Sequence, residues 1–576
     1  MGTSASGDRR GAAHALAVAL VALAAAAAQA GDDPTAKPRR LTTVNIRDAD
    51  SGEIWAAPCR VGDWVRTRAG AGMRYRYEGG TSLTFEREGP RLFVRVDGGP
   101  PRLVGIAINL RGGSEALREA LARGDRSFTI ACSASALEYL PPLPPGRDLS
   151  LSLEGELSNL KPLTRFPHLS ALSVTIAGGA DLGPLRALGS LTALSASFRP
   201  SAKVLGPLAD LRELTFLELT SLEEGADLSP LANLPELRTL RLHEAPVRDL
   251  APIAQLRRLT YLALHRSQKV SDLKPLENLQ ELQCLGLLCF DNVSDLTPLS
   301  RLPRLTHLGV GQFAKPVDTR FLADMPNLES LWITECQLSD VGFLANLPRL
   351  RRLWLGSCKA VRDLSPVWKL TELRELTLNV AGEPLDLKPV ARLPKLATLE
   401  LTVDTTVADL SPLAALTELR SLSIILHPKA SDLSPLAKLT NLTKLELVGK
   451  NLSDVSALTA LPGLVSLSLE TPKLTDLRPI ARLKKLRRLW LRDCPVSDLT
   501  PLAQLTELRY VALRHCERIT DLRPLAKLPN LVCFNMANCG VKDISPLREM
   551  ARRGGDVDVD DDALKEQLKQ MTATNF

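Results

Sequence analysis

Hydrophobic residues recur along most of the chain with a period of 22 or 23 residues. Each period contains a short stretch in which apolar and polar residues alternate, as around Leu240 and Leu242. Such alternation predicts a β-strand, because side chains two residues apart point to the same face. A second stretch places apolar residues at about helical spacing, as at Leu250, Ile253 and Leu256, which predicts a short helical turn.

The segment Asp-Leu-x-Pro-Leu connects the strand stretch to the turn. This segment or a variant of it begins at 18 positions from Asn159 to Asp543; 16 of them are aspartates, and 15 carry proline three residues later. We expect the aspartate to accept hydrogen bonds from backbone amides left unsatisfied at the turn, as an N-cap does. Proline is tolerated there because first-turn amides have no intrahelical partner. A fixed period of this length predicts a solenoid, in which each unit covers the open face of its neighbour.

The complete repeat, Leu-x-x-Leu-x-Leu-x-x-(Asn/Cys)-x-Leu followed by Asp-Leu-x-Pro-Leu, resembles the leucine-rich repeat family. Its short period and its Asp-Leu-x-Pro-Leu turn are most similar to the bacterial internalin type and to the related phosphatase-regulating proteins. This resemblance implies a curved α/β solenoid with a parallel β-sheet on the concave face and short 3-10 turns on the convex face. Members of the family share the scaffold and differ in their exposed residues, so the resemblance does not identify a ligand.

The amino terminus resembles an export signal. Arg9 and Arg10 precede an apolar run that extends to Ala28, and a small-residue Ala-x-Ala sequence ends at Ala30, as before a cleavage site. The run is too short and too rich in alanine to favour a permanent membrane span. The alternative is that it stays uncleaved as a membrane anchor. We expect residues 1–30 to be removed as a signal peptide. The mature chain would then be exported to the periplasm, the cell surface or the medium, without a stable membrane span.

A second segment precedes the repeats. Residues 31–110 hold short alternating stretches broken by glycine pairs and Gly-Pro turns, which predict a small antiparallel β-sandwich. The sequence from Val44 to Glu53, followed by Pro-Cys-Arg at 58–60, resembles the first hairpin of carboxypeptidase regulatory-like (transthyretin-like) domains. This segment would form a separate small domain before the solenoid.

The two ends of the repeat array are expected to form caps, because a solenoid needs atypical terminal units that cover its open faces. Near the start, a helix over residues 114–123 and a strand over 128–130 are predicted, and near the end a strand over 556–559 and a helix over 563–571. The predicted organisation is a signal peptide (1–30), a β-sandwich (31–110), an N-terminal cap with the first strands (111–150), leucine-rich repeats (151–550) and a C-terminal cap (551–576).

Composition and motifs argue against catalysis and against nucleic-acid binding. The 72 basic and 65 acidic side chains give a net charge of +7, and the basic residues are dispersed rather than gathered around a recognition motif. The sequence contains no Gly-x-Ser-x-Gly, His-Glu-x-x-His, Gly-x-x-x-x-Gly-Lys or Gly-x-Gly-x-x-Gly. We therefore expect no enzymatic activity and no cofactor. His243 and His265 occupy equivalent positions in adjacent repeats, but two histidines without a third ligand make a poor metal site.

Six of the ten cysteines are assigned to the Asn/Cys position of the repeat, where a small buried side chain is expected beneath the turn. Equivalent positions in adjacent repeats are separated by about 4.8 Å, farther than the usual Cβ separation in a disulfide of roughly 3.5–4.5 Å. The pattern therefore predicts buried thiols rather than disulfides. The assigned residues are Cys289, Cys336, Cys358, Cys494, Cys516 and Cys539.

Aromatic and arginine side chains stand out among the residues expected on the open face of the strands. Exposed Trp, Tyr and Arg are enriched among the residues that dominate binding energy in protein interfaces. Two clusters are predicted as partner-binding sites, in each of which the rings would form a continuous apolar plate. One cluster is Trp332, Arg352 and Trp354; the other is Arg488, Trp490, Arg492, Tyr510 and Arg514.

Three function classes remain open from the sequence. The first is a non-enzymatic exported scaffold that binds a protein partner through the concave face. The second is a carbohydrate-binding or cell-wall-binding module, in which the same tryptophans stack on sugar rings. The third is an enzyme with its site in residues 41–125, which is disfavoured because that segment has no histidine. The alternative to binding is that the aromatic side chains only pack against each other.

Overall fold

The computed structural model describes seven strands between residues 43 and 109 and then most of the chain from 127 to 573. In this second part the described ranges are 127–134, 137, 148–202, 205–314, 317–336, 338–358, 360–380, 384–402, 405–553 and 555–573. The chain divides into two compact units, Met1–Asp318 (unit 1) and Thr319–Phe576 (unit 2). The predicted signal peptide, residues 1–30, and the predicted helix over 114–123 lie outside the described residues.

Unit 1 begins with strands that pair mainly in antiparallel fashion. They are β1 (Thr43–Asp48), β2 (Ile54–Pro58), β3 (Asp63–Ala69), β4 (Gly72–Tyr77), β5 (Ser82–Glu88), β6 (Arg91–Val96) and β7 (Arg102–Asn109). Strands β3 to β7 form an antiparallel meander, while β1 pairs antiparallel with β2 and parallel with β3. These strands fall where the sequence predicts a small β domain. Their arrangement as a sandwich, and the likeness to carboxypeptidase regulatory-like domains, stay predictions.

From β7 onward the pairing in unit 1 is parallel. The strands are β8 (Ser127–Ser133), β9 (Asp148–Leu157), β10 (Leu169–Ala177), β11 (Ala193–Ala202), β12 (Phe216–Leu222), β13 (Thr239–His243), β14 (Tyr261–His265), β15 (Cys284–Leu288) and β16 (His307–Gly311). Each pairs in parallel with the next. The predicted strand over 128–130 is therefore confirmed as part of β8.

Unit 2 continues the same pattern of short parallel strands. They are β17 (Ser330–Thr334), β18 (Arg352–Gly356), β19 (Glu375–Leu378), β20 (Thr398–Leu401), β21 (Thr406–Val407), β22 (Ser421–Leu426), β23 (Lys444–Gly449), β24 (Ser466–Glu470), β25 (Arg488–Arg492), β26 (Tyr510–Arg514), β27 (Cys533–Ala537) and β28 (Asp556–Val559). Both β20 and β21 pair with β22, so they belong to one layer.

Short 3-10 helices connect the strands in both units. Unit 1 has η3 (Lys161–Arg165), η4 (Gly183–Ala187), η5 (Gly206–Asp210), η6 (Ser229–Asn233), η7 (Ile253–Gln255), η8 (Lys274–Asn278) and η9 (Thr297–Arg301). Unit 2 has η10 (Arg320–Asp324), η11 (Gly342–Asn346), η12 (Val367–Lys369), η13 (Lys388–Arg392), η14 (Ser411–Ala415), η15 (Ser434–Lys438), η16 (Ser456–Ala460), η17 (Ile480–Arg482), η18 (Thr500–Gln504), η19 (Ser545–Leu547) and three α-helices, α3 (Arg523–Ala526), α4 (Arg548–Arg552) and α5 (Asp562–Ala573).

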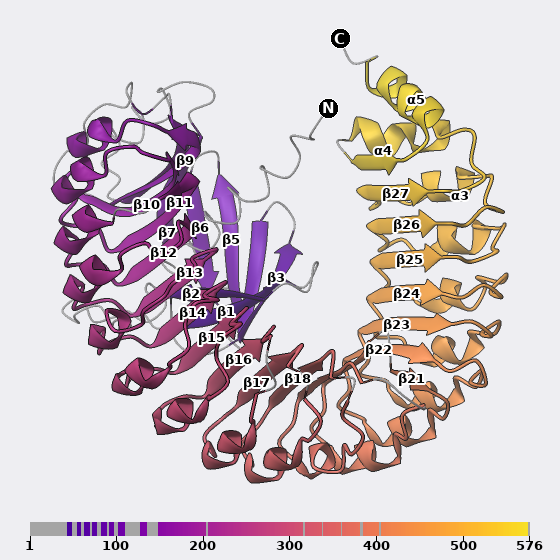
Figure 1. Cartoon of the computed structure of the whole chain (residues 1–576). Helices are drawn as coiled ribbons and strands as arrows, with labels where there is room; N and C mark the ends of the chain where they lie inside the picture. Colours follow the sequence, from indigo (N-terminus) through magenta and orange to yellow (C-terminus); the bar gives the residue numbers. More distant parts are fainter. Residues whose placement is uncertain are drawn as a thin grey trace. The chain divides into compact units, whose positions relative to one another are not determined.

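Within each unit the strands lie on one side of the stack and the 3-10 helices on the other, as Figure 1 shows. Leucines from successive strands fill the space between these two layers. Leu240 of β13, for example, pairs in register with Leu217 of β12 and Leu262 of β14, and all three are fully buried. The predicted α/β solenoid, with a parallel sheet and short 3-10 turns, is confirmed. At the end of unit 2, β28 and α5 match the predicted terminal strand and helix.

The repeated aspartate accepts the backbone hydrogen bond that the sequence predicts, but it precedes the N-cap residue of the 3-10 helix, which is Leu410 at η14. The backbone N–H of Ala251 donates to Asp249 Oδ1 at 2.8 Å. The N–H of Ser411 donates to Asp409 Oδ1, and the Ser411 hydroxyl donates to Asp409 Oδ2, both at 2.9 Å. These hydrogen bonds fix the chain as it leaves the sheet and enters the 3-10 helix. They also favour the ionised carboxylate, and they lower the pKa of Asp409 below its ordinary value, the backbone bond contributing most.

Acid is therefore expected to weaken the fold through these turns. Because the folded-state pKa of Asp409 lies below the unfolded value, its stabilisation is complete above about pH 4 and disappears as pH falls through the folded pKa. Asp363 and Asp432 have equivalent hydrogen bonds and the same direction of pKa shift. The measurement is the urea midpoint from pH 7 to pH 2. In a triple variant with Asn in place of Asp363, Asp409 and Asp432, the urea midpoint should fall less steeply towards acid pH, because an amide accepts the hydrogen bond without titrating. An equally steep fall in the wild type and the variant would contradict this role of the aspartates.

After many of the strands, one residue has a left-handed backbone conformation. It directly precedes the buried residue beneath the turn. Its φ angle is positive at chemically varied residues such as Glu244, Gln312 and His515, so no single residue type marks it in the sequence. This turn corrects one prediction. Cys289 occupies the left-handed position itself, with φ of 61°, and the fully buried residue beneath the turn is Phe290. The assignment of Cys289 to the Asn/Cys position is therefore wrong.

The other assigned cysteines lie beneath the turn as predicted, and they are thiols rather than disulfides. Cys336, Cys358, Cys494 and Cys516 are buried, whereas Cys539 is partly exposed. Burial raises the pKa of the Cys358 thiol to about 11, which keeps it protonated and poorly nucleophilic at neutral pH.

Thiol labelling should reflect this burial. Without reductant, the denatured protein is expected to react at all five of these cysteines, because no disulfide protects them. The folded protein should react slowly at Cys358, since a buried protonated thiol attacks reagents poorly. Mass spectrometry of alkylated peptides measures both reactions. Recovery of a disulfide between any two of the five positions would overturn the prediction.

Candidate functional site

On each strand of the repeats, alternate side chains point away from the leucine core. Along β18, Leu353 and Leu355 are buried, while Trp354 between them is 42% exposed. Among the described residues, Trp354 and Val532 are the large hydrophobic residues classed as exposed. Tryptophan is among the residue types that concentrate binding energy in contact surfaces.

Trp332 and Trp354 lie side by side on β17 and β18, where their Cα atoms pair in register. Their ring centroids are 6.2 Å apart and the ring planes meet at 86°. The two rings are in contact, but they do not form the predicted continuous plate, because one ring stands edge-on to the other. This arrangement is a favourable aromatic contact, and it gives the surface a step rather than a flat plane.

Gly356 provides the space into which the Trp354 indole extends. A Cβ atom at Gly356 would lie 2.7 Å from Trp354 Nε1 and 2.7 Å from Thr334 Oγ1. Both distances are shorter than any ordinary contact of a methyl group. Glycine at this position thus allows the indole to lie along β18, over the end of the strand.

Replacing Gly356 with alanine is expected to displace the Trp354 ring and to destabilise the fold by about 1–3 kcal/mol, the usual cost of overpacking. The readouts are the NMR resonance of the Trp354 indole N–H and the urea midpoint of unfolding. Gly286→Ala is a matched control on β15, because a Cβ there would meet Ala263 Cβ at 3.9 Å, an ordinary contact. An unchanged indole resonance in Gly356→Ala would show that this glycine does not position the ring.

Arg352, the third member of the first cluster, lies beside a carboxylate of the chain itself. It pairs in register with Glu375 of β19, and the neighbouring Arg351 forms an ion pair with Glu329 at 3.5 Å. Opposite charges placed directly across a parallel pair stabilise each other modestly. The surface around Trp332 and Trp354 therefore combines exposed indole with arginines that have acidic neighbours.

The second cluster lies on β25 and β26. The rings of Trp490 and Tyr510 are 4.9 Å apart with an interplanar angle of 40°, so they form a tilted stack rather than a flat plate. Tyr510 pairs in register with Arg488, which lies two residues before Trp490 on β25, and the Arg488 guanidinium lies 6.0 Å from the Trp490 ring centroid. Burial raises the pKa of the Tyr510 phenol, which therefore remains a hydrogen-bond donor at neutral pH.

Arg492 and Arg514 complete the second cluster at the other end of the same two strands. They pair directly in register, and both are exposed. Arg492 lies 3.7 Å from Glu470 and 4.0 Å from Asp493, whereas no carboxylate of the described residues is within ion-pair distance of Arg514. The structure thus brings together all five predicted residues of this cluster, with two like charges adjacent at its edge.

The comparison with known proteins identifies the repeats. A family model described as a leucine-rich repeat region matches residues 193–411, which include strands β11 to β21 and the 3-10 helices between them. The chain is a leucine-rich repeat protein. No curated protein matches it.

Three solved structures are similar to this leucine-rich repeat protein. An internalin from Listeria monocytogenes is 28% identical; the match covers 56% of this chain and 91% of the internalin, with a TM-score of 0.45. A leucine-rich repeat protein of Leptospira interrogans is 19% identical over 68% of this chain and 98% of its own, with a TM-score of 0.46. The functional domain of a second Listeria monocytogenes internalin, described as including a cysteine ladder, is 18% identical over 58% and 70%, with a TM-score of 0.42.

A further cluster of this leucine-rich repeat protein was not predicted from the sequence. In unit 1, the Arg241 guanidinium lies 5.7 Å from the ring centroid of Phe216 and 5.0 Å from that of Tyr261. His243, on the same strand as Arg241, lies 3.6 Å from Glu218. An alignment of the repeats could have revealed this cluster. Phe216 and Tyr261 occupy the same repeat position on β12 and β14, the two neighbours of β13, and β13 carries Arg241.

His243 and His265 approach each other as the sequence suggests, with ring centroids 6.4 Å apart. Burial lowers the pKa of His243, and Glu218 opposes that effect. Within the described ranges, no group of three or more His, Cys, Asp or Glu side chains is arranged to hold a metal ion. In the same part of the chain, no helix is long and apolar enough to cross a membrane.

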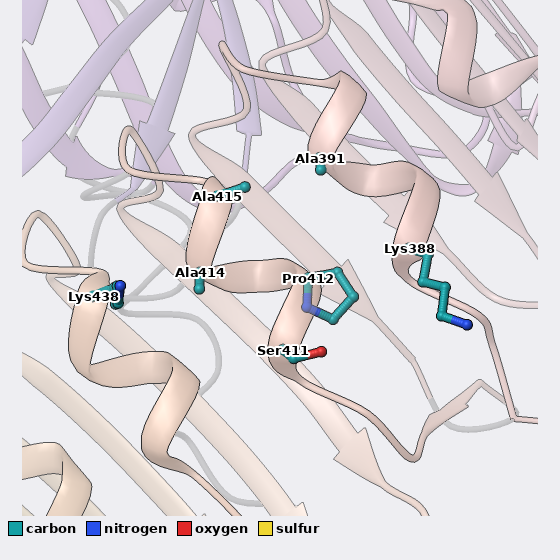
Figure 2. Close-up of a pocket in the computed structure, with 7 residues that line it drawn as sticks. All are labelled: Lys388, Ala391, Ser411, Pro412, Ala414, Ala415 and Lys438. Atoms are coloured by element: carbon teal, nitrogen blue, oxygen red, sulfur yellow. The ribbon is translucent and has the colours of Figure 1, made fainter.

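The side of the leucine-rich repeat protein that carries the 3-10 helices has a shallow depression of about 460 Å³. It is lined by Lys388, Ala391, Ser411, Pro412, Ala414, Ala415 and Lys438. Figure 2 shows the two lysines on opposite sides of the depression. The Ser411 hydroxyl donates to Asp409 at 2.9 Å, so this side chain takes part in the turn that enters η14. The strand face remains the stronger candidate for function.

Proposed function

We propose that this protein is an exported, non-enzymatic scaffold that binds a protein partner through the strand face. The exposed Trp354 indole carries the proposal, because a large apolar ring is open to solvent between two buried leucines. Trp332 and the pair formed by Trp490 and Tyr510 add aromatic area on the same type of surface. Exposed aromatic and arginine side chains are the residue types that concentrate binding energy in interfaces.

The export part of the proposal comes from the sequence of residues 1–30, whose charged start, apolar run and small-residue ending are typical of a signal peptide. Fractionation of cells that produce the full chain tests this part. Export predicts a mature protein outside the cytoplasm that begins near residue 31. Retention of the uncut chain in the cytoplasm would contradict it.

Binding through the strand face is tested by capture of partners with the full chain. The binding variant is Trp332→Ala/Trp354→Ala. The control is Lys438→Ala, which changes an exposed residue on the 3-10 side. A protein captured by the wild type and by the control, but not by the double variant, would support the proposal. Equal capture by all three proteins would exclude this face as the binding surface.

Carbohydrate binding is the second candidate, and the edge-on tryptophan pair supports it. The exposed Trp354 ring offers a flat apolar surface, and the perpendicular Trp332 ring forms a wall beside it, an arrangement on which a sugar ring can stack. A glycan array probed with the same three proteins separates the two functions. Glycan binding that is lost only in the double variant, without any captured protein, would assign the surface to carbohydrate.

A further inference from the structure

We propose that the surface formed by Arg488, Trp490, Arg492, Tyr510 and Arg514, here called the basic aromatic surface, binds an acidic segment of a protein. This inference rests on the proposed function and adds the chemistry of the partner. It concerns β25 and β26 of unit 2 only.

Positive charge at the edge of this surface is only partly compensated by carboxylates of the chain itself. Arg492 and Arg514 stand directly opposite each other on adjacent strands, and like charges in that position destabilise a sheet. Arg492 has acidic neighbours at 3.7 and 4.0 Å, but the described residues place no carboxylate within ion-pair distance of Arg514. A carboxylate from a partner would lie between the two guanidinium groups and would replace repulsion with two charge-assisted hydrogen bonds.

An aromatic anchor lies next to these charges. Trp490 and Tyr510 stack at 4.9 Å and leave their outer surfaces available beside the arginines, since both side chains are only partly buried. The protonated Tyr510 hydroxyl is a further donor for an anionic group. Apolar ring surface bordered by donors suits a segment that alternates acidic and apolar side chains.

The mixed charges around this surface favour a protein partner over a nucleic acid. Carboxylates are placed around the basic aromatic surface: Glu470 and Asp493 lie beside Arg492, and Asp558 acts electrostatically on Tyr510. A chain of regularly spaced phosphates would meet these carboxylates as well as the arginines. A protein segment can present carboxylates only where the arginines are, so the mixed charge pattern favours an acidic protein segment.

The contrast with the first tryptophan pair supports this specificity. Near Trp332 and Trp354, Arg351 forms an ion pair with Glu329, and Arg352 has Glu375 opposite it in register. The arginines there are matched by carboxylates of the chain itself. A preference for acidic partners is therefore expected at β25 and β26 and not at β17 and β18.

The test selects ligands from a display library of random short peptides with the immobilised full chain. Selected peptides are then measured against three variants. Arg514→Glu reverses the charge at the surface, and Arg514→Gln removes it while keeping a polar side chain. Arg482→Glu is the matched control, because it makes the same charge change at an exposed residue of η17, on the 3-10 side. Single-stranded oligothymidylate serves as a competitor to represent nucleic acids.

We expect peptides enriched in Asp and Glu that bind the wild type and the Arg482→Glu control equally. Their affinity should fall about tenfold with Arg514→Glu and by a smaller factor with Arg514→Gln, and it should weaken as salt is added. The inference is overturned if selection enriches no peptides or peptides without an acidic excess, if Arg514→Glu binds as well as the control, or if oligothymidylate binds more tightly than the peptides. None of these results alters the capture test with the Trp332/Trp354 double variant, so the inference and the proposed function can fail separately.

Discussion

Replacing Leu422 with alanine is expected to lower the free energy of unfolding by about 2–5 kcal/mol. Leu422 is 0% exposed and lies on β22 between Leu399 and Leu445, which pair with it in register and are equally buried. Truncation removes apolar contacts with both neighbours and leaves a cavity that the two fixed strands cannot fill. The loss should therefore be at the upper end of what single substitutions cause.

The adjacent residue provides the control. Ser423 follows Leu422 on β22 but points to the opposite face, where it is partly exposed. Ser423→Ala should change the stability by no more than roughly 0.5 kcal/mol. Both variants are measured by the urea midpoint of the full chain. If the serine variant lost more stability than the leucine variant, the assignment of the inward and outward faces would be incorrect.

The architecture was predictable from the sequence because each repeat shows the same pattern of apolar and turn residues. Leu240 and Leu242 show which face of one strand is buried, and the same positions recur in each following strand with little change. Asp249 and its equivalents mark the turns, and their hydrogen bonds are found where the capping argument places them. Errors in one repeat are corrected by agreement among the others, which is not possible in a chain without internal repetition.

The features that escaped prediction depend on how individual side chains meet across strands. The angle between Trp332 and Trp354 follows from the space above Gly356, and a backbone register alone does not specify it. Cys289 was misplaced by one residue because the left-handed turn after β15 accepts many residue types. The stack of Arg241 with Phe216 and Tyr261 requires three strands to be aligned before its members become neighbours.

The candidate site was therefore predicted at the level of residues and not of geometry. Trp490 and Tyr510 were placed on adjacent strands correctly, yet their contact is diagonal, since Tyr510 aligns with Arg488. Long side chains reach such diagonal neighbours. The charge balance around each tryptophan pair also became visible only with the register, because Glu375 and Glu470 belong to neighbouring repeats.

Removing the aromatic anchors is expected to have the largest effect on function. Truncation of a central anchor typically costs 2 kcal/mol or more, a loss of roughly thirtyfold in affinity. The double variants Trp332→Ala/Trp354→Ala and Trp490→Ala/Tyr510→Ala should each lower the affinity for the captured partner by at least about that factor. The reason is that strand faces made of small and charged residues offer little desolvated area, so most of the binding energy must come from the indole and phenol rings.

The two double variants also distinguish one contact surface from two. A partner that contacts both pairs should lose affinity in either variant, whereas a partner that contacts one pair should respond to that variant alone. Isothermal titration with the purified partner measures both losses, and Lys438→Ala on the 3-10 side should leave the affinity unchanged. Each variant must remain folded in a urea titration, so that a loss of affinity reports lost contacts and not unfolding. Unchanged affinity in both double variants would exclude the aromatic side chains of the strand face as the binding surface.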